Sequence, residues 1–269
     1  MVVEKNKKDW NDYAGKWGSY NHSEPILRPV LERPERAFHG TVWGQLCRLF
    51  PGFEGKKICV PSSGDNLAVF AFARLGAQVL SCDIAENQLE NARKVALREG
   101  LAGQITFLCA DTMKLEGVGN GEYDLVYTSN GVHVWLDDLP GMYRNIYRVL
   151  KPGGKNVAYE VHPFQRPFGE GLKLVRPYDA VGPFEDEVTV NFHWRMQDFL
   201  NAILGAGLRL EHVEEMFDEK NYDAPFFLKT ADIIGGKRAS REEVDRMYDW
   251  RQNPAMGLPA WMCLVSEKE

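Results

Sequence analysis

Cysteine is scarce in this sequence, and its few occurrences form no metal or disulfide pattern. Its 269 residues include five cysteines, and no two of them have C-x-x-C spacing. Zinc sites and redox-active thiols usually require such spacing, so we expect no metal site. An odd number of cysteines without it is typical of a cytoplasmic protein with free thiols. Most lie in apolar stretches predicted to be buried strands, where a thiol behaves as a small hydrophobic group. They are Cys47, Cys59, Cys82, Cys109 and Cys263.

Dense positive charge and long apolar runs are also missing. Lys and Arg total 32 against 38 Asp and Glu, which gives a net charge of −6. A nucleic-acid substrate normally requires a basic face, so this class of partner is disfavoured, although a local basic patch remains compatible with the composition. The N-terminus, MVVEKNKKDWNDY, lacks the apolar centre of a secretory signal. No stretch approaches the roughly 18 apolar residues of a membrane-spanning helix. We therefore expect a cytoplasmic protein without a membrane span.

Glycine is sparse in the stretch around which the chain is organised, residues 57–93. It reads KICVPSSGDNLAVFAFARLGAQVLSCDIAENQLENAR. The pattern predicts a strand at 58–60, a tight turn, a helix at 67–75 and a second strand ending on Asp83. This is the layout of a βαβ nucleotide-binding unit, in which the carboxylate bonds ribose hydroxyls. Only Gly64 stands where the dinucleotide fingerprint has its glycines, so the loop alone is weak evidence for a nucleotide.

Strands and helices continue to alternate after this unit. The sequence predicts strands at 105–109, 123–127 and 156–161, and helices at 86–98 and 139–150. Five largely apolar strands alternating with helices argue for a parallel sheet covered on both faces. Ligands of such sheets bind beyond the carboxyl ends of the strands. Those ends carry Ser62, Ser63, Gly64, Asp83, Asp111, Ser129, Asn130 and His162.

An aromatic stripe marks the N-terminal segment, which we take as a helical cap over residues 1–54. Trp10, Tyr13, Trp17 and Tyr20 are spaced by three or four, so they share one helix face. The stripe either packs on the main domain or lies over a ligand, with Tyr13 or Tyr20 reaching in. A further helix is predicted at about 37–50.

The main domain is expected at 55–269, with an irregular insertion at about 163–193. The insertion is rich in Pro, Gly and aromatics, as functional loops and lids often are, and a short hairpin near 188–192 fits its pattern. The remaining elements are expected as helices at 196–204 and 241–250 and strands at 208–213 and 260–265.

Five motifs in the middle of the chain follow a recognisable order. ICVPSSGDN stands where one family has its glycine-rich first motif, and CDIAENQLENAR resembles the second-strand acid and the adenosine-contacting helix of that family. ITFLCADTMKL resembles its third-strand motif, and YDLVYTSNGVHVW with YRVLKPGG resembles the fourth-strand motif and the helix and turn that follow. The family is the class I S-adenosylmethionine-dependent methyltransferases, of the small-molecule, ubiquinone-biosynthesis-like kind. The resemblance covers about 55–161, and weakly 193–265.

The resemblance implies a Rossmann-like fold with a seven-stranded, mostly parallel sheet, helices on both faces and an antiparallel last strand. It implies S-adenosyl-L-methionine as cofactor, with Asp83 on the ribose, Asp111 on the adenine amine, and Thr112 or Met113 beside the ring. The residues that it places on the cofactor are Pro61, Ser62, Ser63, Gly64, Asp83, Ile84, Gln88, Asp111, Thr112, Met113, Ser129 and Asn130.

The sequence departs from the family's pattern around the first motif. Val60 stands where an acid is usual, and Ser62 and Asn66 stand where the family has glycines. Small turn residues still offer N–H groups and hydroxyls to the methionine carboxylate. Asn adopts the left-handed conformation more readily than most residues. Asp65 either contacts the methionine amino group or caps the helix that begins at Leu67.

Structural roles compete with several of these assignments. Asp83 would alternatively cap the helix at 86–98, and Gln88 would alternatively face solvent. Ser129 and Asn130 would alternatively serve only as the entry to the next helix.

Methyl transfer is an in-line displacement at a sulfonium, so a protein mainly supplies positioning and a site that excludes water. A hydroxyl acceptor also needs a base to remove its proton. The candidates for that base are His162 and His133, with His193 as a similar alternative, and each could instead be a packing residue. Arg166 and Arg195 either hold an acidic acceptor or are solvated surface.

We therefore predict an S-adenosylmethionine-dependent methyltransferase that acts on an O or N atom of an unidentified small organic acceptor. Trp135, Phe164, Phe168 and Phe184 either form an apolar acceptor pocket or belong to the ordinary core. The alternatives are an RNA or protein methyltransferase and a non-catalytic S-adenosylmethionine-binding protein. A nicotinamide dehydrogenase is disfavoured because the turn lacks the glycines that let a pyrophosphate approach.

Overall fold

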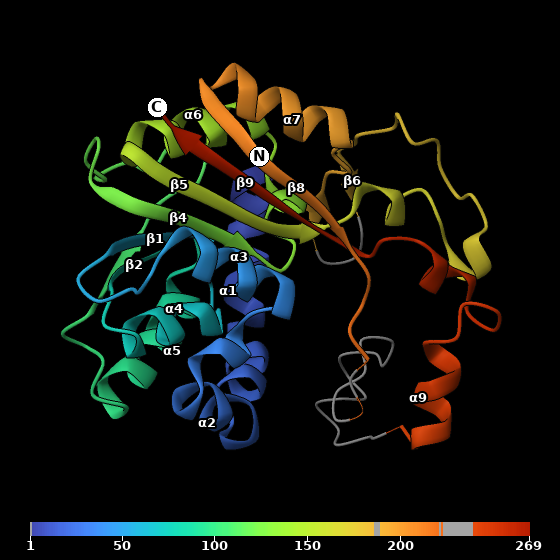
Figure 1. Cartoon of the computed structure of the whole chain (residues 1–269), viewed down its shortest axis with the longest axis horizontal. Helices are drawn as coiled ribbons and strands as arrows, with labels where there is room; N and C mark the ends of the chain where they lie inside the picture. The colour runs from blue at the N-terminus through green and yellow to red at the C-terminus, as the bar shows by residue number, and fades with distance from the viewer. Residues whose placement is uncertain (1, 186–188, 221, 223–238) are drawn as a thin grey trace.

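The computed structural model describes residues 2–185, 189–220, 222 and 239–269. Its centre is a seven-stranded sheet in the order β3-β2-β1-β4-β5-β9-β8 (Figure 1). Neighbouring strands pair in parallel, except that β9 runs antiparallel to both β5 and β8. The predicted seven-stranded α/β sheet with a reversed last strand is confirmed. The strands are β1 (Lys57–Pro61), β2 (Gln78–Asp83), β3 (Ile105–Cys109), β4 (Tyr123–Ser129), β5 (Leu150–Val161), β8 (Leu208–Met216) and β9 (Trp261–Lys268).

Helices cover both faces of this sheet (Figure 1). Consecutive strand residues point to opposite faces, so Ile58 and Val60 join the core beneath α2 to α5, while Cys59 joins the core beneath α6 and α7. This alternation divides the apolar residues into two cores with the sheet between them. The helices are α1 (Val2–Asn21), α2 (Glu24–Glu32), α3 (Gly40–Leu49), α4 (Leu67–Arg74), α5 (Glu86–Arg98), α6 (Leu139–Val149), α7 (Met196–Gly205) and α9 (Arg241–Met247).

Short elements make up the rest of the secondary structure in the described residues. A small second sheet pairs β6 (Phe184–Glu185) with β7 (Val190–Asn191). The single-turn 3₁₀ helices are η1 (Pro34–Ala37), η2 (His133–Trp135), η3 (Pro163–Gln165), η4 (Glu170–Leu172) and η5 (Pro254–Gly257).

Several boundaries differ from the sequence predictions. The helix predicted at 37–50 begins at Gly40, because η1 is a separate element and the His39 ring accepts the N–H of Thr41 at 3.2 Å as a cap. β5 begins at Leu150 rather than 156, with a register shift against β4. The hairpin predicted near 188–192 contains β7, but its partner is β6, and Val188 lies outside the described residues. The helix predicted at 241–250 ends at Met247.

α1 is fixed along α5. Gly18 permits their close approach, since a Cβ there would lie 2.7 Å from Asn91 Nδ2. The same Asn91 amide donates to the carbonyl oxygen of Ala14 at 2.8 Å. One turn after the N-terminus, Lys7 forms a 2.6 Å ion pair with Glu86 at the start of α5. The N-terminal helix is therefore docked on the element that follows β2.

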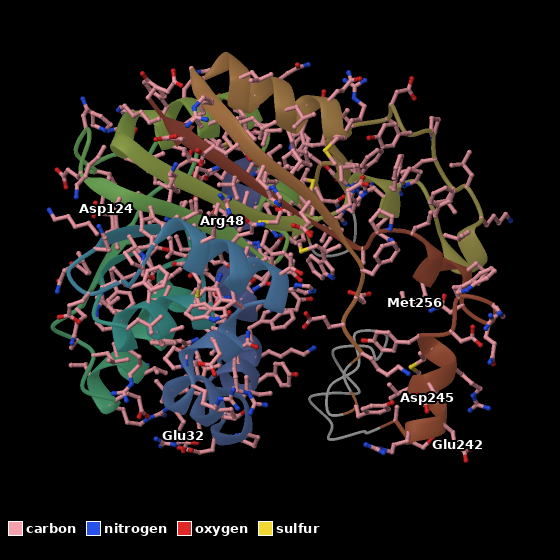
Figure 2. All side chains as sticks on the ribbon, in the orientation of Figure 1. Glu32, Arg48, Asp124, Glu242, Asp245 and Met256 are labelled. Atoms are coloured by element: carbon pink, nitrogen blue, oxygen red, sulfur yellow. The ribbon has the colours of Figure 1, made fainter. Side chains whose placement is uncertain are left out.

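The amino end of β4 is used for strand pairing. Asp124 accepts the N–H of Lys57 at 2.8 Å and pairs with Lys151 Nζ at 2.8 Å (Figure 2). Both partners come from strands beside β4, so this acid fastens the sheet. The polar residues at the opposite, carboxyl ends of the strands have different surroundings.

The described residues contain neither a membrane-spanning helix nor a metal-type cluster of side chains. No helix among them is long and apolar enough to cross a membrane. Nor does that part of the chain contain a group of three or more His, Cys, Asp or Glu side chains arranged to hold a metal ion. All five cysteines are free thiols.

Candidate functional site

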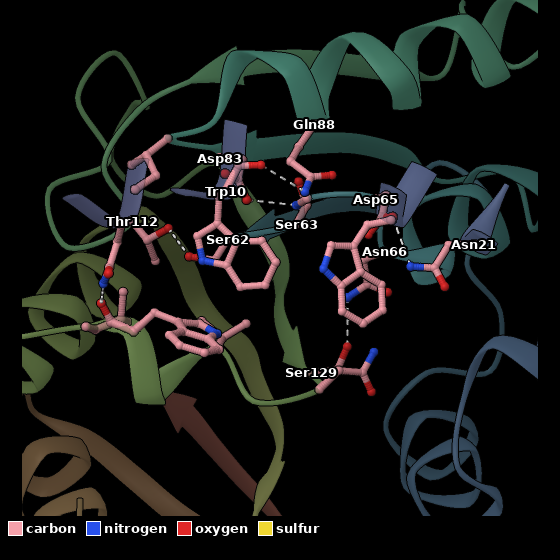
Figure 3. A pocket seen from close by; sticks show the side chains of 18 of the residues that line it. Trp10, Asn21, Ser62, Ser63, Asp65, Asn66, Asp83, Gln88, Thr112 and Ser129 are labelled. Atoms are coloured by element: carbon pink, nitrogen blue, oxygen red, sulfur yellow. Dashed lines mark hydrogen bonds between the residues drawn. The ribbon is translucent and has the colours of Figure 1, made fainter. Parts of the chain in front are cut away.

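A cavity of about 490 Å³ opens where β1, β2, β3 and β4 end (Figure 3). Eleven of the twelve residues that the sequence assigned to a cofactor line it. They come from the last residues of β2 and β4, the four loops that follow these strands and the first turn of α5. Pro61, the last residue of β1, does not line it. The topology therefore brings together side chains that span residues 62–130.

The loop after β1 keeps a tight shape without the usual glycines. Ser62 has a φ of +48° and Gly64 a φ of +50°, so a serine adopts the left-handed conformation in which a glycine is usual. Ser62 Oγ lies 2.6 Å from Thr112 Oγ1, which ties this loop to the loop after β3. Ser63 N–H donates to the carbonyl oxygen of Cys82 at 2.9 Å. Neighbouring loops thus hold the turn in place.

Asn66 caps α4, a role that we had considered for Asp65. Its Oδ1 accepts the N–H of Ala68 at 2.9 Å, and its φ of −62° is not left-handed. Its Nδ2 donates to Ser129 Oγ at 2.8 Å and so connects the loops after β1 and β4. Asp65 instead accepts a hydrogen bond from Asn21 Nδ2 at 2.9 Å, which ties the loop to the end of α1.

Asp83 lies at the centre of one cavity wall (Figure 3). Its Oδ2 accepts the N–H of Gly64 at 2.8 Å, and its Oδ1 accepts the N–H of Ala85 at 2.8 Å. The side chain is buried, and burial raises its pKa to about 6, although both hydrogen bonds act in the opposite direction. Asp83 therefore supports the turn before α5 and also presents a carboxylate to the cavity.

Gln88 lines the same part of the cavity and contains a buried acceptor without a partner among the described residues. The residue is 2% exposed, and its Oε1 has no hydrogen-bond partner among the described residues. Its Nε2 lies 3.4 Å from the carbonyl oxygen of Trp10. A buried amide oxygen without a donor costs about 1–3 kcal/mol, so a ligand hydroxyl at this position would be stabilising. The predicted alternative, a glutamine facing solvent, is wrong.

The loop after β3 is ordered by its own hydrogen bonds. Asp111 Oδ1 accepts the N–H of Met113 at 2.9 Å, and Asn145 Nδ2 donates to the carbonyl oxygen of Met113 at 2.6 Å. Asp111 Oδ2 lies 3.7 Å from Lys114 Nζ. The carboxylate, Thr112 and the buried Met113 side chain together line one end of the cavity.

Tryptophans from two elements add aromatic rings to the cavity walls. Trp10 and Trp17 of α1 and Trp135 of η2 line it, and Trp10 meets Trp135 edge to face at 5.3 Å between ring centroids. The alternative that the aromatic stripe of α1 faces a ligand site is therefore supported. The expectation that Tyr13 or Tyr20 reaches in is wrong, because Trp10 and Trp17, seven residues apart, occupy that face.

The two histidines predicted as bases are held elsewhere. His133 Nδ1 lies 2.6 Å from Glu160 Oε2, and its Nε2 lies 3.2 Å from the Tyr143 hydroxyl, in a buried cluster. His162 Nε2 lies 2.9 Å from Glu215 Oε1, and its Nδ1 accepts the N–H of Phe164. Neither ring lines the cavity. The geometry therefore supports structural roles for both.

The other residues that the sequence suggested for contact with the methyl acceptor have two kinds of surroundings. Arg195 binds Asp198 through two nitrogens at 2.8 and 2.9 Å and caps α7, so it is not free to hold a ligand. His193, Arg166 and Phe184 instead line a second cavity of about 480 Å³, which shares Asn130 and Trp135 with the first.

Sequence reasoning missed several residues of the first cavity. Val3, Asn6, Asn21, Arg36 and Ala37 reach it from the N-terminal helices. Their only sequence signal was the aromatic stripe, because the docking of α1 depends on tertiary contacts with α5 and β7.

Comparison with known proteins agrees with this geometry. A methyltransferase domain family matches residues 61–158. A sterol 24-C-methyltransferase of Neurospora crassa is 37% identical over 154 residues, which are 56% of this chain and 38% of that protein. One of Aspergillus fumigatus is 29% identical over 150 residues, 53% of this chain and 36% of that protein. The chain therefore matches less than half the length of these two relatives.

Solved structures share the fold over most of the chain. An S-adenosylmethionine-dependent methyltransferase of Mesorhizobium loti has a TM-score of 0.59 at 24% identity, covering 85% of this chain and 98% of its own. The geranyl diphosphate C-methyltransferase of Streptomyces coelicolor has a TM-score of 0.61 at 13% identity, covering 100% and 98%. Residues 61–158 of this chain therefore carry a methyltransferase domain, and the chain has the fold of the solved S-adenosylmethionine-dependent methyltransferases.

Proposed function

We propose that this protein binds S-adenosyl-L-methionine in the first cavity and transfers its methyl group to a small organic acceptor. The observation that carries the proposal is one wall on which the buried carboxylate of Asp83 and the unpartnered Oε1 of Gln88 lie together. A ribose presents two adjacent hydroxyls, and these two acceptors suit such a pair of donors. The family match to residues 61–158 supports the same ligand.

The remaining walls fit the other parts of this cofactor. The loop Ser62–Gly64 would hold the methionine carboxylate through its hydroxyls and N–H groups. Asp111 and Met113 would hold the adenine, by a hydrogen bond and by apolar contact respectively. The acid that is usual near the end of β1 is absent, so Asp65 or the Asn130 side chain would contact the amino group, since both line the cavity.

The chain's own contribution to the reaction is orientation and the exclusion of water. When bound, the cofactor supplies an electrophilic methyl group on a sulfonium. Trp10, Trp17 and Trp135 form an apolar wall that would shield this group from solvent. None of the six histidines lines the cavity, so we infer an acceptor atom that attacks without giving up a proton to imidazole.

The atom methylated is a further part of the proposal. A neutral amine nitrogen or an already ionised oxygen satisfies this condition and agrees with the O or N predicted from sequence. An electron-rich carbon satisfies it too, and the relatives from Neurospora crassa and Streptomyces coelicolor are named as C-methyltransferases. Carbon is therefore the second candidate.

We also propose a domain organisation with a helical cap at 1–54 and a main domain at 55–269. The main domain contains a lid or acceptor insertion at about 163–193.

We further propose a cytoplasmic location. Five free cysteines and the lack of a metal-type cysteine pattern support this location. Cell fractionation of the tagged native chain would test it, and recovery in a membrane or secreted fraction would contradict it.

Calorimetric titration tests the proposed cofactor. We expect S-adenosylmethionine and S-adenosylhomocysteine to bind with one site per chain, and NADH to show no heat. Absence of binding at millimolar cofactor would rule out the proposal. Incubation with methyl-labelled cofactor and separate pools of metabolites, RNA and protein then distinguishes the alternatives. Label in RNA or protein would favour a macromolecular acceptor, and binding without transfer to any pool would favour a non-catalytic binding protein.

A further inference from the structure

The second cavity adjoins the first. Asn130 and Trp135 line both, so a molecule in the second cavity would lie next to whatever occupies the first. Its other walls come from the end of β5, the insertion after β5 and the β6–β7 hairpin. It is therefore formed largely by the segment that the sequence marked as irregular, together with the loop after β4 that also lines the first cavity.

Two arginines of this cavity have unusually few partners. Within the part of the chain that the structure describes, neither Arg166 nor Arg176 makes a side-chain hydrogen bond or a salt bridge. The Arg176 guanidinium lies 4.1 Å above the Phe184 ring, a contact that orients it and leaves its N–H groups available. By contrast, Arg148 makes five side-chain hydrogen bonds. The described residues thus leave the ten N–H donors of Arg166 and Arg176 without a hydrogen-bond acceptor.

The backbone fixes these two arginines as neighbours. Arg176 N–H lies 3.4 Å from the carbonyl oxygen of Pro167, the residue after Arg166. His193 lies beside both, and its N–H donates to the carbonyl oxygen of Val181 at 2.8 Å. The His193 ring packs on Phe184 at 4.6 Å between centroids. Phe184 therefore contacts both Arg176 and His193, with its ring tilted by 47° against the imidazole.

The pKa of His193 is sensitive to the positive charge in this cavity. Burial, followed by the charges of Arg166 and Arg176, lowers its pKa to about 4, so the imidazole is neutral near pH 7. Its Nδ1 is buried and has no hydrogen-bond partner among the described residues. A neutral imidazole carries one N–H, which can donate to an anion beside the two guanidinium groups.

The carboxylates near this cavity in the described part of the chain offset little of its positive charge. Glu160 is close enough to influence Arg166, but it is committed to His133 Nδ1 at 2.6 Å and to the N–H of Val161 at 2.7 Å. Glu185 lines the cavity but is exposed to solvent, so its attraction is screened. Among the described residues that line the cavity, two partly buried cations thus face one solvated anion.

We propose that this second cavity binds an oxyanion, a carboxylate or a phosphate, carried by the methyl acceptor. Guanidinium groups match the planar oxygen pairs of both anions. The acceptor would extend from Arg166 and Arg176 past Trp135, so that its reactive atom enters the first cavity. This inference rests on the proposed function, because it takes the first cavity as the cofactor site. It adds a charge requirement for the acceptor.

Small aromatic probes test the charge requirement without knowledge of the acceptor. Benzoate, phenyl phosphate and the uncharged isostere benzamide would be titrated calorimetrically into the full-length protein saturated with S-adenosylhomocysteine. We expect at least one anion to bind about tenfold or more tightly than benzamide, as charge-assisted hydrogen bonds to guanidinium imply. A tighter benzoate would indicate an organic acid as acceptor, and a tighter phenyl phosphate would indicate a phosphorylated one.

Arg166→Gln and Arg176→Gln should each reduce the preference for the anion by about tenfold. The matched control, Arg251→Gln, changes an exposed arginine far from the cavity along the chain and should leave the preference unchanged. Equal binding of anion and amide to the wild-type protein would overturn the inference, whatever the variants do. So would a preference that survives both arginine substitutions.

Cofactor binding is measured in the same samples and separates the two proposals. If S-adenosylhomocysteine binds and the anion preference is absent, only the anion site fails. If the cofactor does not bind, the proposed function fails, and titration of the same three probes into the free protein still decides whether the second cavity holds an anion. Thermal unfolding of each variant shows whether a lost preference comes from a lost fold.

Discussion

At the scale of single residues, the cavity depends on a carboxylate that titrates near neutral pH. Asp83 accepts N–H groups from Gly64 and Ala85, both at 2.8 Å, and is nevertheless held at a pKa of about 6 by burial. The ionised form is the better acceptor for two ribose hydroxyls, because a protonated carboxyl uses one oxygen as a donor. Cofactor binding should therefore be linked to the proton on Asp83.

The linkage predicts the direction of a pH effect. Below about pH 6, Asp83 takes up a proton in the free protein, and the Kd for S-adenosylmethionine should rise by up to about tenfold per pH unit. Above about pH 7, where Asp83 is ionised, its titration should no longer change the Kd with pH. Calorimetry between pH 5 and 8 measures it. Asp83→Asn should bind more weakly at pH 7.5 by about 1–3 kcal/mol, with the pH dependence lost. An unchanged pH profile in that variant would remove Asp83 from the binding site.

The loop after β1 makes a second prediction at this scale. Ser62 has a φ of +48° and a hydroxyl 2.6 Å from Thr112 Oγ1. Ser62→Ala loses the hydrogen bond and keeps the backbone strain, whereas Ser62→Gly loses the same bond and relieves the strain. The free energy of unfolding of the glycine variant should therefore be about 1 kcal/mol higher than that of the alanine variant. Urea denaturation compares the pair, and equal stabilities would mean that the turn is unstrained.

At the scale of elements, one buried asparagine fastens α1 to the walls of the site. Asn6 is 1% exposed, its Oδ1 accepts the N–H of Val190 at 2.9 Å, and its Nδ2 donates to the carbonyl oxygens of Val190 and Trp135 at 2.9 and 3.1 Å. The side chain thus joins α1 to both β7 and η2. Its position in the sequence gives no hint of this, because both partners lie more than a hundred residues away.

Asn6→Ala should lower the free energy of unfolding by about 3 kcal/mol, since it leaves several buried backbone groups unpaired. It should also weaken cofactor binding, because Trp135 loses one of its attachments. The matched control is Asn11→Ala on the same helix, where the Oδ1 of the half-buried Asn11 accepts the N–H of Asn87 at 2.8 Å. That loss should cost about 1 kcal/mol. Similar losses in the two variants would contradict a special role for Asn6.

The helices and strands could be predicted from the sequence, but the boundaries that depend on tertiary contacts could not. The pattern located α5 at 86–98 and β3 at 105–109 because local periodicity and caps determine such elements. The observed starts of α3 and β5 differ from the predicted ones. The start of α3 depends on the His39 ring, which caps the helix, and the start of β5 depends on the pairing of Leu150 with β4. Predictions based on local sequence do not include those tertiary contacts.

At the scale of the whole molecule, the same contrast applies to the candidate site. The four loops from the sheet were predictable, because parallel strands end at one edge and their polar residues must meet there. The histidines could not be placed, because burial beside Glu160 or Glu215 is a property of the folded chain. The wall from α1 was recognisable only as an aromatic stripe, and its ligand-facing members were Trp10 and Trp17.

The cavity therefore joins two parts of the molecule, the sheet and the N-terminal helix, and a bound cofactor would contact both. Hydrogen exchange should show the amides of α1 slowing when S-adenosylhomocysteine binds, because opening of α1 would then also break the contacts of Trp10 and Trp17 with the ligand. α7 packs on the far face of the sheet and does not line the cavity, so its exchange is the internal control. Slowing in the loop after β1 without slowing in α1 would mean that the cofactor binds to the sheet alone and that the N-terminal helix is not part of the site.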